Sequence, residues 1–265
     1  MITDRELHEE GVDSIRDYKA LCTGSHPEYH TPQTLDALQN YRDQGGRLVY
    51  LGGNGFYWKI ALSPEDPGLI EIRRGESGIR AWAAEPGEYY HSFNGSYGGL
   101  WRRNGRPPQL LAGVGFSAQG KFEGSYYRST AESRAPDLAW MFEGIEDQEI
   151  LGDFGFSGGG AAGFELDRAD VRLGTPEEVR VVASSENHTS SFVLVPEEML
   201  THITNWPGEE EQQKLIRSDI VYFQTPSGGE VFSTGSITFC GSLPWNDFDN
   251  NISRLLENVI RRFLQ

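Results

Sequence analysis

The sequence has little cysteine and no long apolar run. Its two cysteines, Cys22 and Cys240, are far apart and form neither a CxxC pair nor a His/Cys spacing typical of a metal site. No stretch approaches the roughly 20 apolar residues that cross a bilayer. Residues 1–7 lack the basic and apolar segments of a signal peptide. These absences favour a reducing cytoplasm and predict no membrane partner.

Positive charge is also scarce. The 23 Lys and Arg residues face 39 Asp and Glu residues, which gives a formal net charge of −16. Such an excess of negative charge repels nucleic acid phosphates and anionic lipid, so neither is expected as a partner. Aromatic residues, in contrast, make up 12% of the sequence, which excludes a disordered chain. We therefore expect residues 1–265 to fold as a single domain with a sizeable core.

The first third of the sequence alternates predicted helices and strands. Its expected elements are a helix over 5–10 capped by Asp4, an apolar run at 18–22, a helix after Thr31-Pro32, and a buried strand at 47–51. Threonine followed by proline is typical of a helix start, because the proline needs no hydrogen-bond acceptor in the first turn. Strand, helix and strand at this spacing predict a βαβ unit with parallel pairing.

The rest of the sequence falls into two parts with different residue patterns. From about 58 to 170 the sequence is dense in Gly, Pro, Tyr and Trp, and we interpret it as a β-rich insertion. Regular patterns then return, with predicted strands at 179–184 and 191–195 and a hairpin over 220–233. A closing helix, capped by Asp249 or Asn250, shows apolar residues at a 3.6-residue period.

These elements predict an α/β fold with a flavodoxin-like parallel sheet, helices on both faces and an insertion at about 58–170. A doubly wound sheet needs central strands before its first βαβ unit. The sequence instead opens with helix-capping residues. We therefore expect one or more N-terminal strands to be missing.

The loop after the first predicted strand contains His26-Pro27-Glu28. Ligand sites in open α/β sheets lie at the carboxyl ends of strands. Glu28 can therefore serve as a hard oxygen ligand or a general base, and His26 can orient a water or a neighbouring group. Alternatively, Glu28 complements the positive N-terminus of the helix that begins near Pro32, and His26 is a surface residue.

The loop after the next predicted strand reads Gly52-Gly53-Asn54-Gly55. Its glycines allow a sharp turn and a close backbone approach to a small ligand. The amide of Asn54 can donate to, and accept from, a substrate carbonyl or formyl group. The alternative is a tight turn that needs an asparagine in the left-handed conformation.

A third candidate lies in the middle of the sequence. Residues 158–163 formally satisfy GxGxxG, but no helix pattern follows, so a nucleotide loop is disfavoured. Glu165, just beyond, can reach a shared site as a base, or it can be a solvated or salt-bridged strand residue. His188 has no second histidine nearby in sequence, and we interpret it as structural.

Several longer strings carry a resemblance to a known family. They are Thr23–Tyr29, Tyr50–Trp58, Ala81–His91, Val231–Ser236 and Asp249–Asn251. Through them the chain resembles the C-terminal part of the large subunit of the N,N-dimethylformamidases, over essentially its whole length. That subunit is much longer than this chain and ends in a glutamine amidotransferase-like α/β domain. The resemblance therefore implies that fold here.

The resemblance also implies a function. It implies hydrolysis of N,N-dimethylformamide to dimethylamine and formate at a mononuclear iron, in an assembly of small and large subunits. Two tyrosines and one glutamate hold the iron in the family, and the glutamate corresponds to Glu28. The neighbouring histidine corresponds to His26, the active-site asparagine to Asn54 and a further acidic residue to Glu165. The tyrosines are expected upstream of Ile2, so this chain alone is predicted to be metal-poor and inactive.

Two other interpretations remain open at this point. Glutamine amidotransferase-like folds commonly hold a nucleophilic cysteine at the strand end near which Asn54 lies. Its absence here permits a non-catalytic amidotransferase-like module that serves assembly. The Trp- and Tyr-rich middle permits an unrelated amidase or a sugar-binding protein.

Overall fold

The structure is a computed structural model, and it describes residues 1–66, 68–74, 85–195 and 207–265. The described α-helices are α1 (Asp4–Glu10), α2 (Pro32–Asp43), α3 (Pro108–Ala112), α5 (Glu209–Leu215), α6 (Phe239–Ser242) and α7 (Asn251–Phe263). The described strands are β1 (Leu21–Cys22), β2 (Tyr29–His30), β3 (Arg47–Tyr50), β4 (Trp58–Leu62), β5 (Ile70–Ile72), β6 (Gly115–Ser129), β7 (Ile150–Leu151), β8 (Ala162–Arg168), β9 (Arg180–Glu186), β10 (Val193–Leu194), β11 (Asp219–Gln224) and β12 (Glu230–Ser233). Residues 81–84, part of one string that carries the family resemblance, lie outside the described residues.

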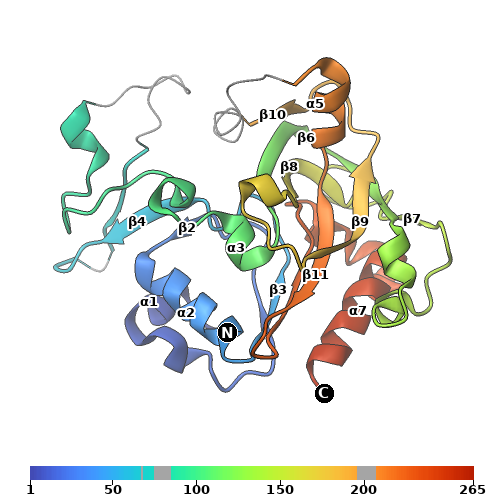
Figure 1. Cartoon of the computed structure of the whole chain (residues 1–265), viewed down its shortest axis with the longest axis horizontal. Helices are drawn as coiled ribbons and strands as arrows, with labels where there is room; N and C mark the ends of the chain where they lie inside the picture. The colour runs from blue at the N-terminus through green and yellow to red at the C-terminus, as the bar shows by residue number, and fades with distance from the viewer. Residues whose placement is uncertain (67, 75–84, 196–206) are drawn as a thin grey trace.

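Most of the described strands belong to one mixed sheet that curls around the molecule (Figure 1). Its order is β1-β3-β12-β11-β9-β6-β10, and β7 and β8 also pair with β6. The β1/β3 and β3/β12 pairs are parallel. Every other pair in this sheet is antiparallel. A smaller sheet of β2, β4 and β5 lies beside it.

The predicted flavodoxin-like, glutamine amidotransferase-like parallel sheet with helices on both faces is wrong. Parallel neighbours need a long crossover, and α2 provides one between β1 and β3. The strands of the hairpin β11/β12 are joined by a short turn, and such a connection gives antiparallel pairing. The expectation of missing N-terminal strands rested on the doubly wound sheet and has no further basis.

The segment at about 58–170, interpreted as a β-rich insertion, contributes strands to both sheets. Strands β6, β7 and β8 come from the segment at about 58–170, yet they pair within the main sheet. The long strand β6 contacts β7, β8, β9 and β10 along its length, which makes this segment part of the framework. The division of the chain into one domain with an insertion stays a prediction.

Several local predictions are confirmed. Helix α2 begins after Thr31, whose side chain accepts from the Thr34 backbone N–H, with proline in the first turn. Helix α7 is capped by Asn250. The βαβ unit and the β11/β12 hairpin are present. Helix α1 is capped by Thr3 in place of Asp4, through a reciprocal pair of hydrogen bonds with Glu6.

Strand β3 is buried on both faces. Leu48 and Tyr50 pack with α1 and α2, whereas Val49 packs with α7 on the opposite face. Figure 1 shows α1 and α2 on one side of β3 and α7 on the other. The carboxyl end of β3, where the loop with Asn54 begins, is therefore held in place by two apolar clusters. No helix among the described residues has both the length and the apolar composition needed to cross a bilayer.

Candidate functional site

Two loops leave the parallel strands β1 and β3 at the same edge of the sheet. The backbone N–H of Gly53 donates to the Ser25 carbonyl at 3.2 Å, and that of Phe56 donates to the Pro27 carbonyl at 2.7 Å. A Cβ on Gly52 would lie 2.4 Å from the Ser25 oxygen, so a side chain there would force the loops apart. The glycine-rich sequence thus lets loop 23–28 and loop 51–57 bind backbone to backbone.

Asn54 lies at the tip of the second loop, and its side chain points into the site. Its φ of 50° is left-handed, a conformation that asparagine tolerates better than most residues. The side-chain Nδ2 donates to Oε1 of Glu28 at 3.1 Å and lies 3.4 Å from Nε2 of His26. The residue is 4% exposed. Within the described residues, its Oδ1 is buried and has no hydrogen-bond partner.

Strand β8 brings Glu165 to the same place. A Cβ on Gly53 would lie 2.6 Å from the backbone oxygen of Glu165, so the loop and the strand touch through their main chains. Nε2 of His26 lies 3.2 Å from Oε2 of Glu28 and 3.2 Å from Oε2 of Glu165. The side chains of the two glutamates are 12% and 8% exposed, whereas that of His26 is 38% exposed. The imidazole therefore lies between two largely buried carboxylates and the solvent.

These carboxylates set the charge of the imidazole. The hydrogen bond to Glu28 raises the pKa of His26 above its ordinary value, and partial burial opposes this shift. The negative charges of Glu165, Glu28 and Asp167 raise the pKa further. The protonated form of His26 is thus favoured, and it can neutralise part of the negative charge at the site.

A fifth residue, Asp167, lies beneath this cluster and was not singled out from the sequence. Its Oδ1 accepts from the backbone N–H of Asn54 at 2.7 Å, and its Oδ2 accepts from the Tyr50 hydroxyl at 2.8 Å. It lies two positions after Glu165 in strand β8. Because side chains of a strand alternate between faces, that spacing could have placed both carboxylates on the same face from sequence alone.

His30 is a second residue near the site that was not predicted from the sequence. Its ring nitrogens lie 3.0 Å from the Pro27 carbonyl and 3.1 Å from the Thr34 hydroxyl. Burial lowers the pKa of His30 to about 4, so the ring is neutral at physiological pH. It links loop 23–28 to α2 and has a structural role.

The residues present fit a hard metal ion in part. Asn54 donates to Oε1 of Glu28 and His26 lies beside Oε2, and a carboxylate oxygen can accept more than one interaction. Anionic oxygen is the donor type that iron(III) prefers. Among the described residues, no group of three or more His, Cys, Asp or Glu side chains is arranged to hold a metal. Glu28 therefore fits as one oxygen ligand, and the other ligands of a complete site would have to come from elsewhere.

The structure brings together all four candidate residues from the sequence. Glu28 contacts His26 and Asn54, and the cap of α2 is Thr31. The alternative that Glu28 complements the positive end of α2 stays a prediction. Glu165 is a buried strand residue paired with His26, which agrees with the salt-bridged form of its alternative and not with the solvated form. The left-handed turn and the proposed site role of Asn54 are compatible, since both describe the same residue. The catalytic and metal-binding roles stay predictions.

The two other candidates lie outside this cluster. The glycine-rich residues 158–163 run into strand β8 and open no helix. His188 bonds to the Ser185 hydroxyl at 2.7 Å, and burial lowers the pKa of His188 to about 4. Both observations agree with the interpretations drawn from the sequence.

The fold and the site thus describe a mixed-sheet protein with a cluster of carboxylates, imidazole and amide at the ends of two parallel strands. Residues 1–251 match the family described as "N,N-dimethylformamidase beta subunit-like, C-terminal". The chain belongs to this family, which confirms the resemblance seen in the sequence.

Two curated relatives are similar over almost the whole chain. The chain is 41% identical over 263 residues to an N,N-dimethylformamidase beta subunit of Alcaligenes sp, which covers 99% of this chain and 34% of the relative. It is 42% identical over 263 residues to the N,N-dimethylformamidase beta subunit of Paracoccus aminophilus, with the same two coverages. The chain thus spans about a third of the length of these relatives.

Proposed function

We propose that this chain supplies one side of the active site of an iron-dependent N,N-dimethylformamidase. The enzyme would hydrolyse N,N-dimethylformamide to dimethylamine and formate. The observation that carries the proposal is the convergence of two glutamates, one buried and one largely buried, on one imidazole, with an asparagine amide in contact. The names of the relatives support the substrate class.

Glu28 would bind the iron, and two tyrosines from outside this chain would complete the ligand set. When bound, iron(III) would supply Lewis-acid polarisation of the amide carbonyl or a lowered pKa of a bound water. The side chains around Glu28 fix the orientation of its carboxylate. Asn54 holds Oε1, and His26 lies at hydrogen-bonding distance from Oε2. Such neighbours typically orient a metal-binding carboxylate.

Glu165 would act as the general base. It would take a proton from the attacking water while the water oxygen bonds to the carbonyl carbon. The C–N bond would then break, and the proton would pass to the departing dimethylamine. Nε2 of His26 lies 3.2 Å from a carboxylate oxygen of each glutamate. His26 would therefore hold Glu165 close to Glu28 and stabilise the negative charge of both.

Asn54 would hold the reactants. A carboxylate only accepts hydrogen bonds, so Nδ2 must face Glu28 and Oδ1 must be the amide atom without a partner among the described residues. Oδ1 would accept from the attacking water. The second Nδ2 hydrogen would donate to the oxygen of the substrate carbonyl.

Partners form part of the same proposal. One carboxylate ligand does not hold iron usefully, so the isolated chain is expected to be metal-poor and inactive. The active form would contain small subunits, further large subunits and the polypeptide that carries the tyrosines.

The test uses the assembled enzyme that contains this chain, with Glu28→Ala as the variant. Iron content and dimethylformamide hydrolysis are expected to fall together. Glu186→Ala, which removes an exposed carboxylate paired with Arg128, is the matched control and should keep both. A Glu28→Ala enzyme with full iron and full activity would refute the metal assignment. Faster hydrolysis of longer amides than of formamides would refute the substrate class.

A further inference from the structure

The turn that carries Asn54 is stabilised from below by a fully buried acid. Asp167 has no exposed surface, and its Oδ1 accepts from the Asn54 backbone N–H at 2.7 Å. The side-chain Nδ2 of Asn54 donates to Oε1 of Glu28 at 3.1 Å. Asp167 therefore fixes the backbone of the residue whose side chain enters the site.

A second path connects the same acid to the next residue of the turn. The Tyr50 hydroxyl donates to Oδ2 of Asp167 at 2.8 Å and accepts from the backbone N–H of Gly55 at 2.8 Å. Burial raises the pKa of Tyr50 well above its ordinary value, and the neighbouring Asp167 raises it further. Tyr50 thus stays protonated and keeps donating to the acid.

These two sets of hydrogen bonds stabilise a left-handed backbone conformation, which most residues adopt only at a cost in energy. Asn54 and Phe56 both have positive φ values, 50° and 56°. Left-handed conformations of this kind persist where the surroundings hold them. Two successive N–H groups of the turn are bound by one acid, directly at Asn54 and through Tyr50 at Gly55.

We propose that Asp167 is a positioning residue for formamide hydrolysis, which holds the turn at Asn54 so that its amide meets Glu28 and His26. The inference rests on the proposed function. Asp167 acts through Asn54, and its two oxygens face the backbone of the turn and the Tyr50 hydroxyl.

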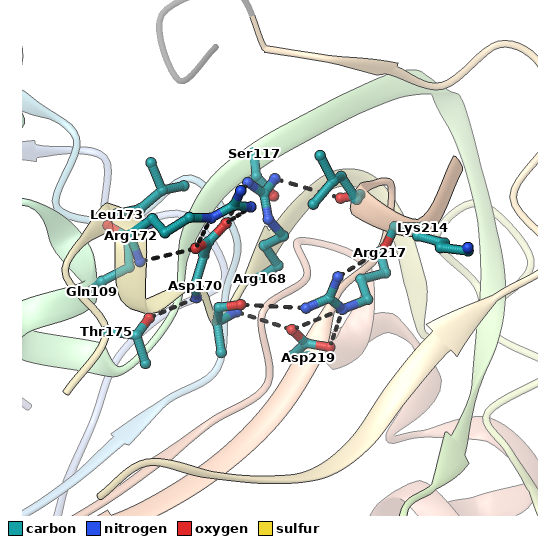
Figure 2. Close-up of polar contacts among 12 residues, drawn as sticks. Gln109, Ser117, Arg168, Asp170, Arg172, Leu173, Thr175, Lys214, Arg217 and Asp219 are labelled. Carbon is teal, nitrogen blue, oxygen red and sulfur yellow. Dashed lines mark hydrogen bonds and ion pairs between the residues drawn. The ribbon is translucent and has the colours of Figure 1, made fainter. Parts of the chain in front are cut away.

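The chain offers a matched control in Asp219 of β11. This acid is also fully buried, and it also accepts from a backbone N–H, that of Ala169, at 2.9 Å. It also accepts from the Ser184 hydroxyl. Arg217 donates to it as well, as Figure 2 shows. In the part of the chain that the structure describes, Asp219 has no hydrogen bond to loop 51–57. Asp219→Asn therefore reproduces the loss of a buried charge away from the site.

The first measurement is backbone hydrogen exchange of the chain itself, which needs no activity. In Asp167→Asn, exchange of the Asn54 N–H should accelerate roughly tenfold to a hundredfold more than in Asp219→Asn, because the neutral amide has one acceptor oxygen for two donors and no charge to strengthen the bond. Equal exchange at Asn54 in the two variants would overturn the proposal. If Asp167→Asn does not fold, Tyr50→Phe decides, since it should accelerate exchange at Gly55 and Asn54. Unchanged exchange there would also overturn the proposal.

The second measurement is dimethylformamide hydrolysis by the assembled enzyme. In Asp167→Asn, kcat should fall on the order of tenfold to a hundredfold while KM changes little, because the reacting groups are displaced. Tyr50→Phe should give a smaller fall of the same kind, and Asp219→Asn should keep the wild-type kcat. A kcat in Asp167→Asn equal to that of Asp219→Asn would overturn the proposed role. A wild-type enzyme that does not hydrolyse formamides would refute the proposed function, while the exchange measurement would still test whether Asp167 holds the turn.

Discussion

Strand β8 connects two regions that hold buried carboxylates in different ways. On the site side, Glu28 and Glu165 face the imidazole of His26. Beyond the strand, Asp170 and Asp219 face guanidinium groups, from Arg168 and Arg172 in one case and from Arg217 in the other (Figure 2). Arg168 is itself almost completely buried.

The difference lies in how pH affects the two regions. A guanidinium group keeps its charge at any physiological pH, whereas an imidazole gains and loses its proton near neutrality. Burial would raise the pKa of Asp170, but the hydrogen bonds from Arg172 and Arg168 lower it to about 2. The arginine network therefore has constant charge and suits a structural role. The His26 cluster can exchange a proton and suits chemistry.

The largest effect that would sharpen this comparison is on activity. Glu165→Gln keeps the shape of the side chain and removes its basic oxygen. In the assembled enzyme we expect kcat for dimethylformamide to fall roughly 10²- to 10⁴-fold, the usual contribution of a general base. Steady-state kinetics measures this effect, and the unfolding midpoint serves as the control for folding. Wild-type kcat in this variant would remove Glu165 from the mechanism.

The next effect is on stability, in the arginine network. Arg168→Met leaves Asp170 buried without its buried cationic partner. We expect a loss of about 3 kcal/mol of unfolding free energy, because the acid loses its buried cationic partner and keeps only the exposed Arg172. Urea denaturation of the chain gives the value. A loss below that of an ordinary surface substitution would show that the network does not hold this region.

A smaller effect concerns pH. Because the pKa of His26 is raised on folding, its contribution to stability is complete below the unfolded pKa of about 6.5 and is lost as pH rises through the folded value. Asp170 behaves in the opposite way, since its contribution is present above its unfolded pKa and is lost as pH falls through about 2. Above about pH 6.5, stability should therefore respond to the titration of His26 and not to that of Asp170.

NMR titration of His26 provides the measurement. The wild-type pKa should lie above the ordinary histidine value, and Glu165→Gln should lower it, because one of the causes of the shift is removed. The same substitution should leave the titration of His188 unchanged. A His26 pKa that is insensitive to Glu165 would contradict the coupling between them.

The smallest effect is expected at Arg172. Its side chain is 62% exposed, although it bonds to the same acid as Arg168. Arg172→Ala should cost no more than about 1 kcal/mol, since water screens an exposed ion pair. Chemical denaturation of Arg172→Ala and Arg168→Met under the same conditions compares the two losses of unfolding free energy. Equal losses would show that burial does not decide how much each arginine contributes.

The sequence predicted local structure much better than the fold. Helices α2 and α7 follow from their caps and apolar periods, and the hairpin β11/β12 follows from its turn residues. The parallel pair β1/β3 follows from one strand-helix-strand pattern. These features depend on residues that are close in sequence, so local rules are sufficient.

The remaining sheet could not be derived in this way. Strand β6 pairs with β8 and β9, which lie far along the chain, through a glycine-rich stretch without a clear period. Register shifts between β6 and β8 interrupt the alternation further. The site residues were easier to predict than the fold, because His26, Glu28 and Asn54 lie on loops after the predicted parallel strands. Asp167 was missed because sequence motifs do not report a side chain that binds a backbone N–H, and its spacing of two residues from Glu165 was the one available signal.

Gly53 has one further consequence. Main chain touches main chain at this position, where even a single carbon would lie 2.6 Å from the Glu165 carbonyl oxygen. Gly53→Ala would therefore push Asn54 and Glu165 apart without changing either side chain. The distance between Asn54 and Glu165 thus depends on the lack of a side chain at Gly53.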